Sequence, residues 1–181
     1  MRKWIVGLGV LLLGIKALAA PIDVAKSSII IVFSQMGVPI EAQFKRFSGD
    51  VQFDAAAPAN TRAALTVDVA SFDLGDPEYN KEVQKPEWFN AEKFTNATFT
   101  SNAVRVLSAD KLEADGQLTI KGRTQKIVVP ISVKQNGKQQ IFSGELAIKR
   151  LAFAIGEGEW SATDMVEDNV KIRFTVVTAA Q

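Results

Sequence analysis

The chain has 181 residues, 47% of them hydrophobic and 23% charged, which is typical of one globular domain. It contains no histidine and no cysteine. Their absence excludes a Ser-His-Asp triad, a thiolate nucleophile and zinc sites of the HExxH or cysteine type. The sequence also has no P-loop and no GxGxxG motif after a strand, so the common nucleotide-binding motifs are absent.

The first 19 residues have the three regions of a secretory signal peptide. Arg2 and Lys3 precede an apolar run over residues 4–15, and Ala17-Leu18-Ala19 supplies a small-residue cleavage site. The run is shorter than the roughly 20 residues of a membrane-spanning helix, and a retained N-terminal anchor is the alternative reading. We expect cleavage after Ala19, which leaves a mature domain of residues 20–181 in the periplasm.

The charge of the mature domain argues against nucleic acid as a partner. The signal segment carries three of the 21 basic residues and none of the 20 acidic ones, so the mature net charge is 18 − 20 = −2. A nucleic-acid-binding domain would show a basic stripe, and none is present.

Three strands are predicted before residue 71, because apolar side chains recur at every second position. They cover about residues 22–34, 38–54 and 63–70. The second strand contains Gly49, which suggests a bulge or tight bend within a single long strand. The inward faces carry Ile29, Ile31 and Phe33, then Phe44, Val51 and Phe53, then Leu65, Val67 and Val69.

Residues 71–99 are the one long interruption of the strand pattern. Asp76 followed by Pro77 predicts the start of a short helix over residues 77–84, since Asp caps the first turn and Pro is tolerated there. Pro86 then ends the helix. The aromatics Trp88 and Phe89 follow on the connector, and we expect them to cover the mouth of a pocket as a lid.

Five further strands are predicted at about residues 97–107, 111–121, 127–133, 142–148 and 170–176. Asn136-Gly137 is a strong hairpin signal. Pro130 lies inside the third of these strands and predicts a bulge or a weakly paired position. The last two strands are separated by a long loop, residues 151–169, that contains GEGEW and an acidic cluster.

Eight antiparallel strands with one helical interruption predict an all-β fold, either an up-and-down barrel or a sandwich. An eight-stranded barrel is just wide enough to hold one small ligand. Small inward residues such as Ala114, Gly116 and Gly144 leave room inside, although a filled core with the same alternation fits the pattern equally.

The acidic cluster leaves one catalytic alternative open. Glu157 and Glu159, or Asp164, Glu167 and Asp168, could supply a carboxylate pair for a hydrolase. They could also bind Ca²⁺, but the spacing of a dedicated calcium loop is missing. Acidic side chains on a long loop are usually solvated, and this reading is preferred.

Several segments together resemble the YceI-like family of exported polyisoprenoid-binding proteins. They are LTVDVASFDLGDPEYNKEVQKPEWFNAEKFTNATFTS, GQLTIKGRTQKIVVP, IKRLAFAIGEGEW and VEDNVKIRF. The resemblance implies a lipocalin-like barrel in the periplasm that encloses a long isoprenoid lipid, of polyprenyl or quinone type. Many members carry a His where this chain has residues 34–37. Residues 152–156, Ala-Phe-Ala-Ile-Gly, replace an Asp-Phe-Gly-Ile-Gly type run, so the backbone there is less permissive.

The combined prediction is an eight-stranded, lipocalin-like barrel that binds an isoprenoid lipid or quinone for transport or storage, without catalysis and without another cofactor. A stress-related structural protein with a filled core is the alternative. Transient contact with a membrane and a homodimer are further partners that the sequence leaves open. The predicted ligand-binding residues are Phe33, Phe44, Phe53, Val67, Trp88, Phe89, Phe99, Leu118, Ile120, Ile148, Phe153, Trp160 and Phe174.

Overall fold

The computed structural model describes residues 19–179. The strands in this range are β1 (Ala19–Pro21), β2 (Ser28–Gln35), β3 (Val38–Phe44), β4 (Phe47–Gln52), β5 (Arg62–Asp68), β6 (Phe72–Asp73), β7 (Asn96–Ser108), β8 (Lys111–Ile120), β9 (Arg123–Asn136), β10 (Gln139–Lys149) and β11 (Asn169–Val177). One α-helix, α1, covers Pro77–Glu82, and short 3₁₀ turns η1 to η5 cover Val24–Lys26, Pro58–Asn60, Val69–Ser71, Arg150–Phe153 and Gly158–Ser161. The predicted signal peptide falls outside the described residues except for Ala19.

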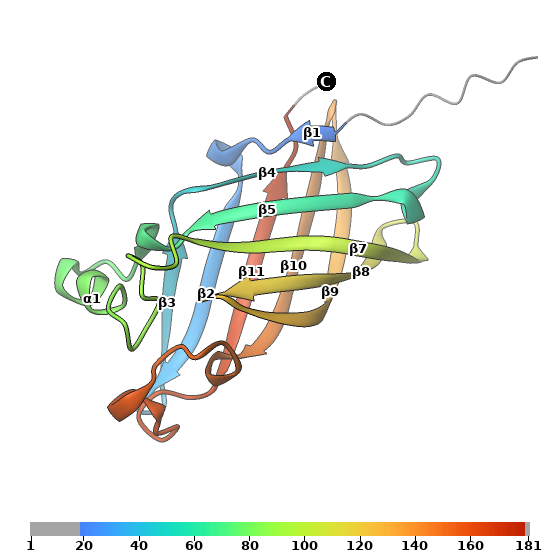
Figure 1. Cartoon of the computed structure of the whole chain (residues 1–181). Helices are drawn as coiled ribbons and strands as arrows, with labels where there is room; N and C mark the ends of the chain where they lie inside the picture. Colours follow the sequence, from blue (N-terminus) through green and yellow to red (C-terminus); the bar gives the residue numbers. More distant parts are fainter. Residues whose placement is uncertain (1–18, 180–181) are drawn as a thin grey trace, which may run out of the picture.

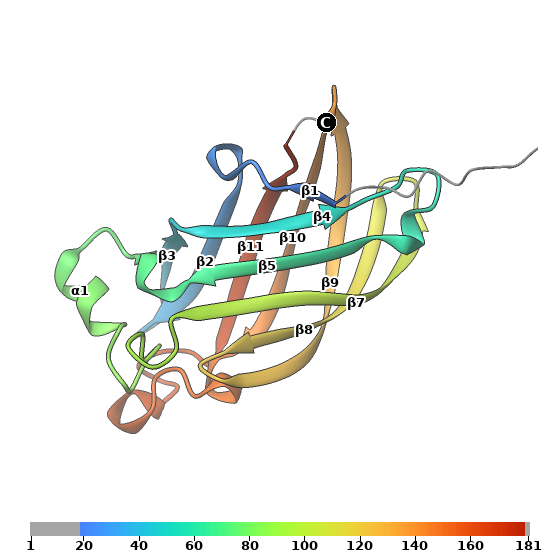
Figure 2. The ribbon, with the colours of Figure 1, turned by 45° about the horizontal axis from the view of Figure 1, so that its top comes forward.

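All strands belong to one antiparallel sheet with the order β1-β4-β5-β7-β8-β9-β10-β11-β2-β3-β6. The sheet curls on itself as a half-barrel, so that β4, β5 and β7 cross in front of β2, β11 and β10 (Figure 1). Figure 2 shows the same crossing from a second direction. The predicted all-β, lipocalin-like class is confirmed at this level.

The count of eight strands is not confirmed. Residues 38–54 form two strands instead of one, because the chain turns at Lys45 and Arg46. The Lys45 amide donates to the carbonyl of Ser71, the Arg46 amide donates to Ser71 Oγ, and the Asp68 amide donates to the carbonyl of Arg46. Two very short strands, β1 and β6, complete the larger number.

Pro130 lies where β9 is paired with β8 but no longer with β10. It pairs with Glu113 of β8, but pairing of β9 with β10 stops at Ser132. Because proline has no amide hydrogen, it fits a position where the ladder on one side of the strand is missing. Close contact replaces the ladder there, since a Cβ on Gly144 would stand 2.2 Å from the Pro130 carbonyl oxygen. The predicted weakly paired position is confirmed.

The helix α1 begins where the sequence indicates and ends two residues early. Asp76 caps it, since its side chain accepts from the amides of Glu78 and Tyr79. The segment before it is fixed by Asp73, which accepts from the side chain of Asn80 at 2.8 Å. In the part of the chain that the structure describes, no helix is long and apolar enough to cross a membrane.

The ends of the half-barrel are closed by different segments. At one end the residues after β1 link two strands, because the Ile22 amide donates to the Gly49 carbonyl and the Asp23 amide to that of Val177. At the other end lie the α1 connector and the loop between β10 and β11, lower left in Figure 1. Buried side chains pack in several clusters around the interior, and Phe153 and Val69 are the largest that are fully buried.

Candidate ligand-binding cavity

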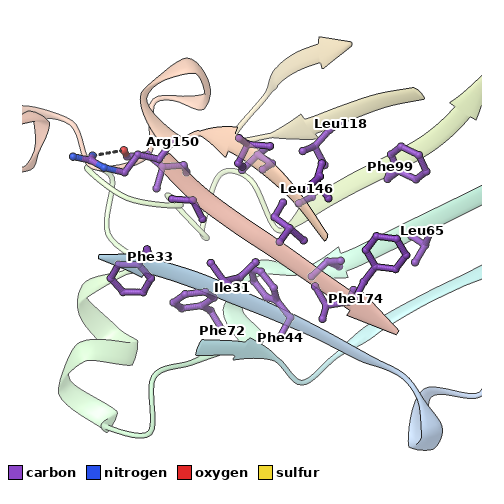
Figure 3. A pocket seen from close by; sticks show the side chains of 18 of the residues that line it. Ile31, Phe33, Phe44, Leu65, Phe72, Phe99, Leu118, Leu146, Arg150 and Phe174 are labelled. Atoms are coloured by element: carbon purple, nitrogen blue, oxygen red, sulfur yellow. Dashed lines mark hydrogen bonds between the residues drawn. The ribbon is translucent and has the colours of Figure 1, made fainter. Parts of the chain in front are cut away.

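The interior of the half-barrel is hollow. A cavity of about 630 Å³ lies between the crossing strands. Figure 3 shows side chains from both layers pointing into it, with Phe44 of β3 and Phe174 of β11 in one layer and Phe99 of β7 in the other. This volume falls within the roughly 300–1,000 Å³ of small-molecule sites, so the space is large enough to hold a small ligand.

Most of the predicted ligand-binding residues line this cavity. They are Phe33, Phe44, Val67, Trp88, Phe89, Phe99, Leu118, Ile120, Ile148, Trp160 and Phe174. Phe53 and Phe153 lie elsewhere. Phe53 packs edge-on against Phe142 at 5.4 Å between ring centroids, and Phe153, only 1% exposed, belongs to the core beside Val69. Whether the lining residues contact a ligand remains a prediction.

Sequence reasoning missed a second group of lining residues. It includes Ile40, Phe72, Leu74, Val83, Phe142, Arg150 and Val166. The period-two pattern places Phe142 on the inward face of β10, and it could also have found Ile40, which alternates with outward positions on β3. Phe72, Leu74 and Val166 lie on short irregular segments, where no repeat indicates which side faces inward.

The connector aromatics are built into the cavity wall. The rings of Phe89, Phe44 and Phe72 form a triangle with centroid distances of 5.0, 5.3 and 5.9 Å. Trp88 packs on Trp160 at 5.4 Å, and its buried indole Nε1 has no hydrogen-bond partner among the described residues. Such contacts stabilise aromatic pairs beyond simple area burial, so the two connector residues are part of the cavity wall. Their role as a lid stays a prediction.

The cavity reaches the surface beside α1. Of the described residues that line it, those classed as exposed are Gly75, Asp76 and Tyr79. Tyr79 is 63% exposed. Gln35, at the end of β2, also lines the cavity. The opening therefore lies between the α1 connector and the end of β2.

Arg150 organises the loop that closes this end. It is 3% exposed, and all five of its N–H donors bond to backbone carbonyls. The acceptors are Ile155, Gly156, Trp160, Val166 and Glu167, at 2.7 to 3.2 Å. Burial lowers the pKa of Arg150, and the charge of nearby Asp168 acts in the opposite direction.

Two further groups of hydrogen bonds hold the same loop. Lys121 Nζ donates to the Ala154 carbonyl at 2.7 Å and to Glu157 at 2.9 Å. The hydrogen bond from Lys121 lowers the pKa of Glu157. The amides of Gly156 and Glu157 both donate to the carbonyl of Glu87 on the α1 connector. The β10–β11 loop and the connector are thus joined into one cap.

Ala154 has a backbone conformation that glycine adopts more easily. Its φ is +57°, in the left-handed region, where it ends the 3₁₀ turn η4. A Cβ in this conformation crowds the following carbonyl. Two residues later, Gly156 has φ +74°, and an added Cβ would stand 2.2 Å from Arg150 Nη1. A side chain at residue 156 would clash with the Arg150 guanidinium, so only glycine fits there.

The acidic cluster on the β10–β11 loop does not face the cavity. Asp168 accepts from the Leu151 amide at 3.0 Å, and Glu157 pairs with Lys121. None of the five acids predicted as catalytic candidates lines the cavity. Within residues 19–179, no three Asp, Glu, His or Cys side chains are grouped to hold a metal ion.

A curled antiparallel sheet around an apolar cavity, capped at one end, is the architecture of a lipocalin-like binding protein. A YceI-like domain model matches residues 21–178, and the chain therefore belongs to the YceI-like family. A UPF0312 protein of Ectopseudomonas mendocina is 28% identical over 171 residues, which cover 88% of this chain and 90% of that protein. A UPF0312 protein of Shewanella baltica is 33% identical over 106 residues, but that match spans only 58% of this chain and 56% of the relative.

Solved structures show the same fold. The crystal structure of BcnA from Burkholderia cenocepacia has a TM-score of 0.85 and 47% identity, and the match covers 87% of this chain and 99% of that one. A polyisoprenoid-binding domain from Saccharophagus degradans has a TM-score of 0.74 at 17% identity, covering 91% of this chain and 99% of the domain. At this identity the second likeness concerns the fold alone.

Proposed function

We propose that this protein binds a long apolar isoprenoid lipid, of polyprenyl or quinone type, inside its cavity and serves to transport or store it. The observation that carries the proposal is the 630 Å³ cavity, which is lined almost throughout by aliphatic and aromatic side chains. Membership of the YceI-like family and the fold shared with a polyisoprenoid-binding domain support this ligand class. The protein acts by binding and not by catalysis.

The expected affinity follows from the size of the ligand. A chain of about 20 carbons, at up to roughly 0.3 kcal/mol per heavy atom, gives on the order of 6 kcal/mol. That corresponds to a dissociation constant of about tens of micromolar, and a preformed cavity improves on it. Because the walls are held by strand pairing and aromatic clusters, little ordering of the protein is needed on binding.

Organic extraction of the purified protein followed by mass spectrometry tests the proposal directly. Added prenyl quinone should also change tryptophan fluorescence, because Trp88 and Trp160 both line the cavity and are the only tryptophans after residue 19. An extract without lipid, together with unchanged fluorescence and thermal stability on addition of prenyl quinones, would show that the cavity is not a lipid site.

A matched pair of variants separates cavity binding from adsorption on the surface. Ala114 on β8 is 2% exposed and lines the cavity, so Ala114→Phe should fill part of it and weaken lipid binding. Ala147 on β10 is exposed, so Ala147→Phe adds the same ring to the outside. Binding that is equal in both variants would exclude the cavity as the site.

A periplasmic location is part of the proposal. It rests on the N-terminal signal sequence, which predicts a mature chain that begins at Ala20. Ala20 pairs with Val51 of β4, so removal of the preceding residues keeps most of the β1 contact. The intact mass of the exported protein, measured after cell fractionation, tests both the location and the cleavage site.

A further inference from the structure

We propose that the cavity selects isoprenoids with an uncharged head group and rejects polyprenyl phosphates. The inference rests on the proposed function and defines its ligand class by charge. It follows from two independent features, which are the lack of an unpaired cation among the described residues that line the cavity and the acidic character of the opening.

The described residues that line the cavity offer no unpaired cation to a phosphate. Arg150 is the one Lys or Arg among the described residues that line it. Its five N–H groups all bond to backbone carbonyls of its own loop, and Figure 3 shows the guanidinium pointing away from the other lining side chains. A phosphate in the cavity would have to break these bonds to gain a charged donor.

The opening is lined by carboxylates. Asp76 and Glu82 both belong to the cavity lining, and Asp76 is exposed. Two neighbouring cations are already paired, Lys81 of α1 with Glu78 at 3.0 Å and Lys85 of the connector with Glu82 at 2.5 Å. A phosphate at the opening would meet acids directly and would have to compete for these lysines.

The two segments that form the cap carry most of the negative charge of the protein. Residues 70–95 contain six acidic and three basic side chains, and residues 150–168 contain five acidic and one basic, which together give −7. From residue 20 onward the chain has a net charge of −2, so the rest of the barrel carries −2 + 7 = +5. The field at the opening therefore opposes an approaching anion.

An uncharged head group meets neither obstacle. A phosphate monoester carries about −1.5 to −2 charges at pH 7, and moving it into an apolar cavity without a partner removes its hydration at a large cost. A hydroxyl or a quinone carbonyl has only one or two polar atoms to desolvate. An uncharged and a phosphorylated ligand can have the same apolar chain. The difference between their affinities then isolates the effect of the head-group charge.

Binding of geranylgeraniol and of geranylgeranyl monophosphate to the mature protein tests the inference. Both are followed by tryptophan fluorescence below their aggregation concentrations. At low ionic strength the alcohol should bind at least about tenfold more tightly than the phosphate, since several like charges face the phosphate near the protein surface. Added salt should reduce the ratio of the two dissociation constants, because it screens the repulsion at the opening.

The double variant Asp76→Asn, Glu82→Gln tests the role of the opening. Asn is as good an N-cap as Asp, so α1 should be retained, which circular dichroism checks. The ratio of phosphate to alcohol dissociation constants should fall several-fold. The matched control Asp54→Asn, Asp110→Asn removes the same charge from the loop after β4 and the β7–β8 turn, opposite α1 (Figure 1), and should leave the ratio unchanged.

The outcomes separate this inference from the proposed function. Equal or tighter binding of the phosphate, beside clear binding of the alcohol, would overturn the charge selection and leave the isoprenoid site intact. Failure of both ligands to bind would overturn both proposals. A ratio that falls equally in the double variant and in its control would refute the part assigned to Asp76 and Glu82.

Discussion

Replacing Arg150 should destabilise the protein strongly, although the residue has no carboxylate in its own hydrogen-bond set. Arg150→Met keeps much of the aliphatic volume and removes all five N–H donors. The carbonyls of residues 155, 156, 160, 166 and 167 then lose their partner together. Since these carbonyls belong to one loop, the whole β10–β11 cap should loosen at once.

The loss in the free energy of unfolding caused by Arg150→Met can be bounded from these hydrogen bonds. A buried polar group left without its partner costs about 1–3 kcal/mol of folding stability, and five such carbonyls set the upper limit of the loss. Water that enters the loosened loop can bond to some of these carbonyls, which lowers the actual loss. Removing the buried charge also recovers its desolvation cost, so we expect a net loss of about 3–5 kcal/mol in the free energy of unfolding. For a domain of this size, that lowers the melting temperature by about 6–20 °C.

The assay is urea and thermal unfolding of the mature protein, followed by limited proteolysis of residues 150–168. Arg150→Lys is the matched control, because an ammonium keeps the charge but has three donors and no planar fork. It should give an intermediate loss of about 2–3 kcal/mol. A methionine variant as stable as the native protein, with an equally protected loop, would show that the carbonyl contacts of Arg150 do not hold the cap.

Three other predictions concern the same end of the molecule. Ala154→Gly should stabilise the fold by about 0.5–1 kcal/mol, because relief of the left-handed conformation exceeds the added chain entropy, and chemical denaturation measures the gain. Hydrogen bonds from Lys45, Asn80 and the Gly75 amide lower the pKa of Asp73 from 3.8 to about 2. Its stabilising effect should thus be complete above about pH 4 and disappear as the pH falls toward 2, whereas Asp73→Asn should lower the melting temperature at neutral pH and flatten this acid dependence. Trp88→Ala should reduce the stability of the ligand-free protein by about 2–4 kcal/mol and also speed ligand release, since Trp88 packs in the core clusters and lines the cavity.

A specific result would contradict each of these three predictions. A less stable Ala154→Gly variant would mean that the methyl group packs favourably enough to outweigh the strain. An acid dependence that Asp73→Asn leaves unchanged would assign the acid loss to other carboxylates. For Trp88, a normal release rate in a clearly destabilised variant would reduce its role to that of a wall residue.

Features that depend on neighbouring residues in the chain were predictable from the sequence. The alternation of Leu112, Ala114, Leu118 and Ile120 indicates which face of β8 is inward, because side chains of a strand point to opposite sides in turn. The helix start at residues 76–77 and the hairpin at residues 136–137 rest on equally local rules of capping and turn geometry. Most of the cavity lining follows from such patterns.

Only the tertiary structure decided that the inward faces enclose a space instead of filling it. A period of two assigns side chains to a face, but the distance between opposite walls depends on how far the sheet curls, which is set by contacts between residues distant in sequence. The turn at residues 45–46 is held by residues 68–71, and Arg150 bonds to carbonyls up to 17 residues away. A buried arginine leaves no periodic signal, because its partners are backbone atoms that every sequence has; its role, and the hollow it helps to close, exist only in the folded chain.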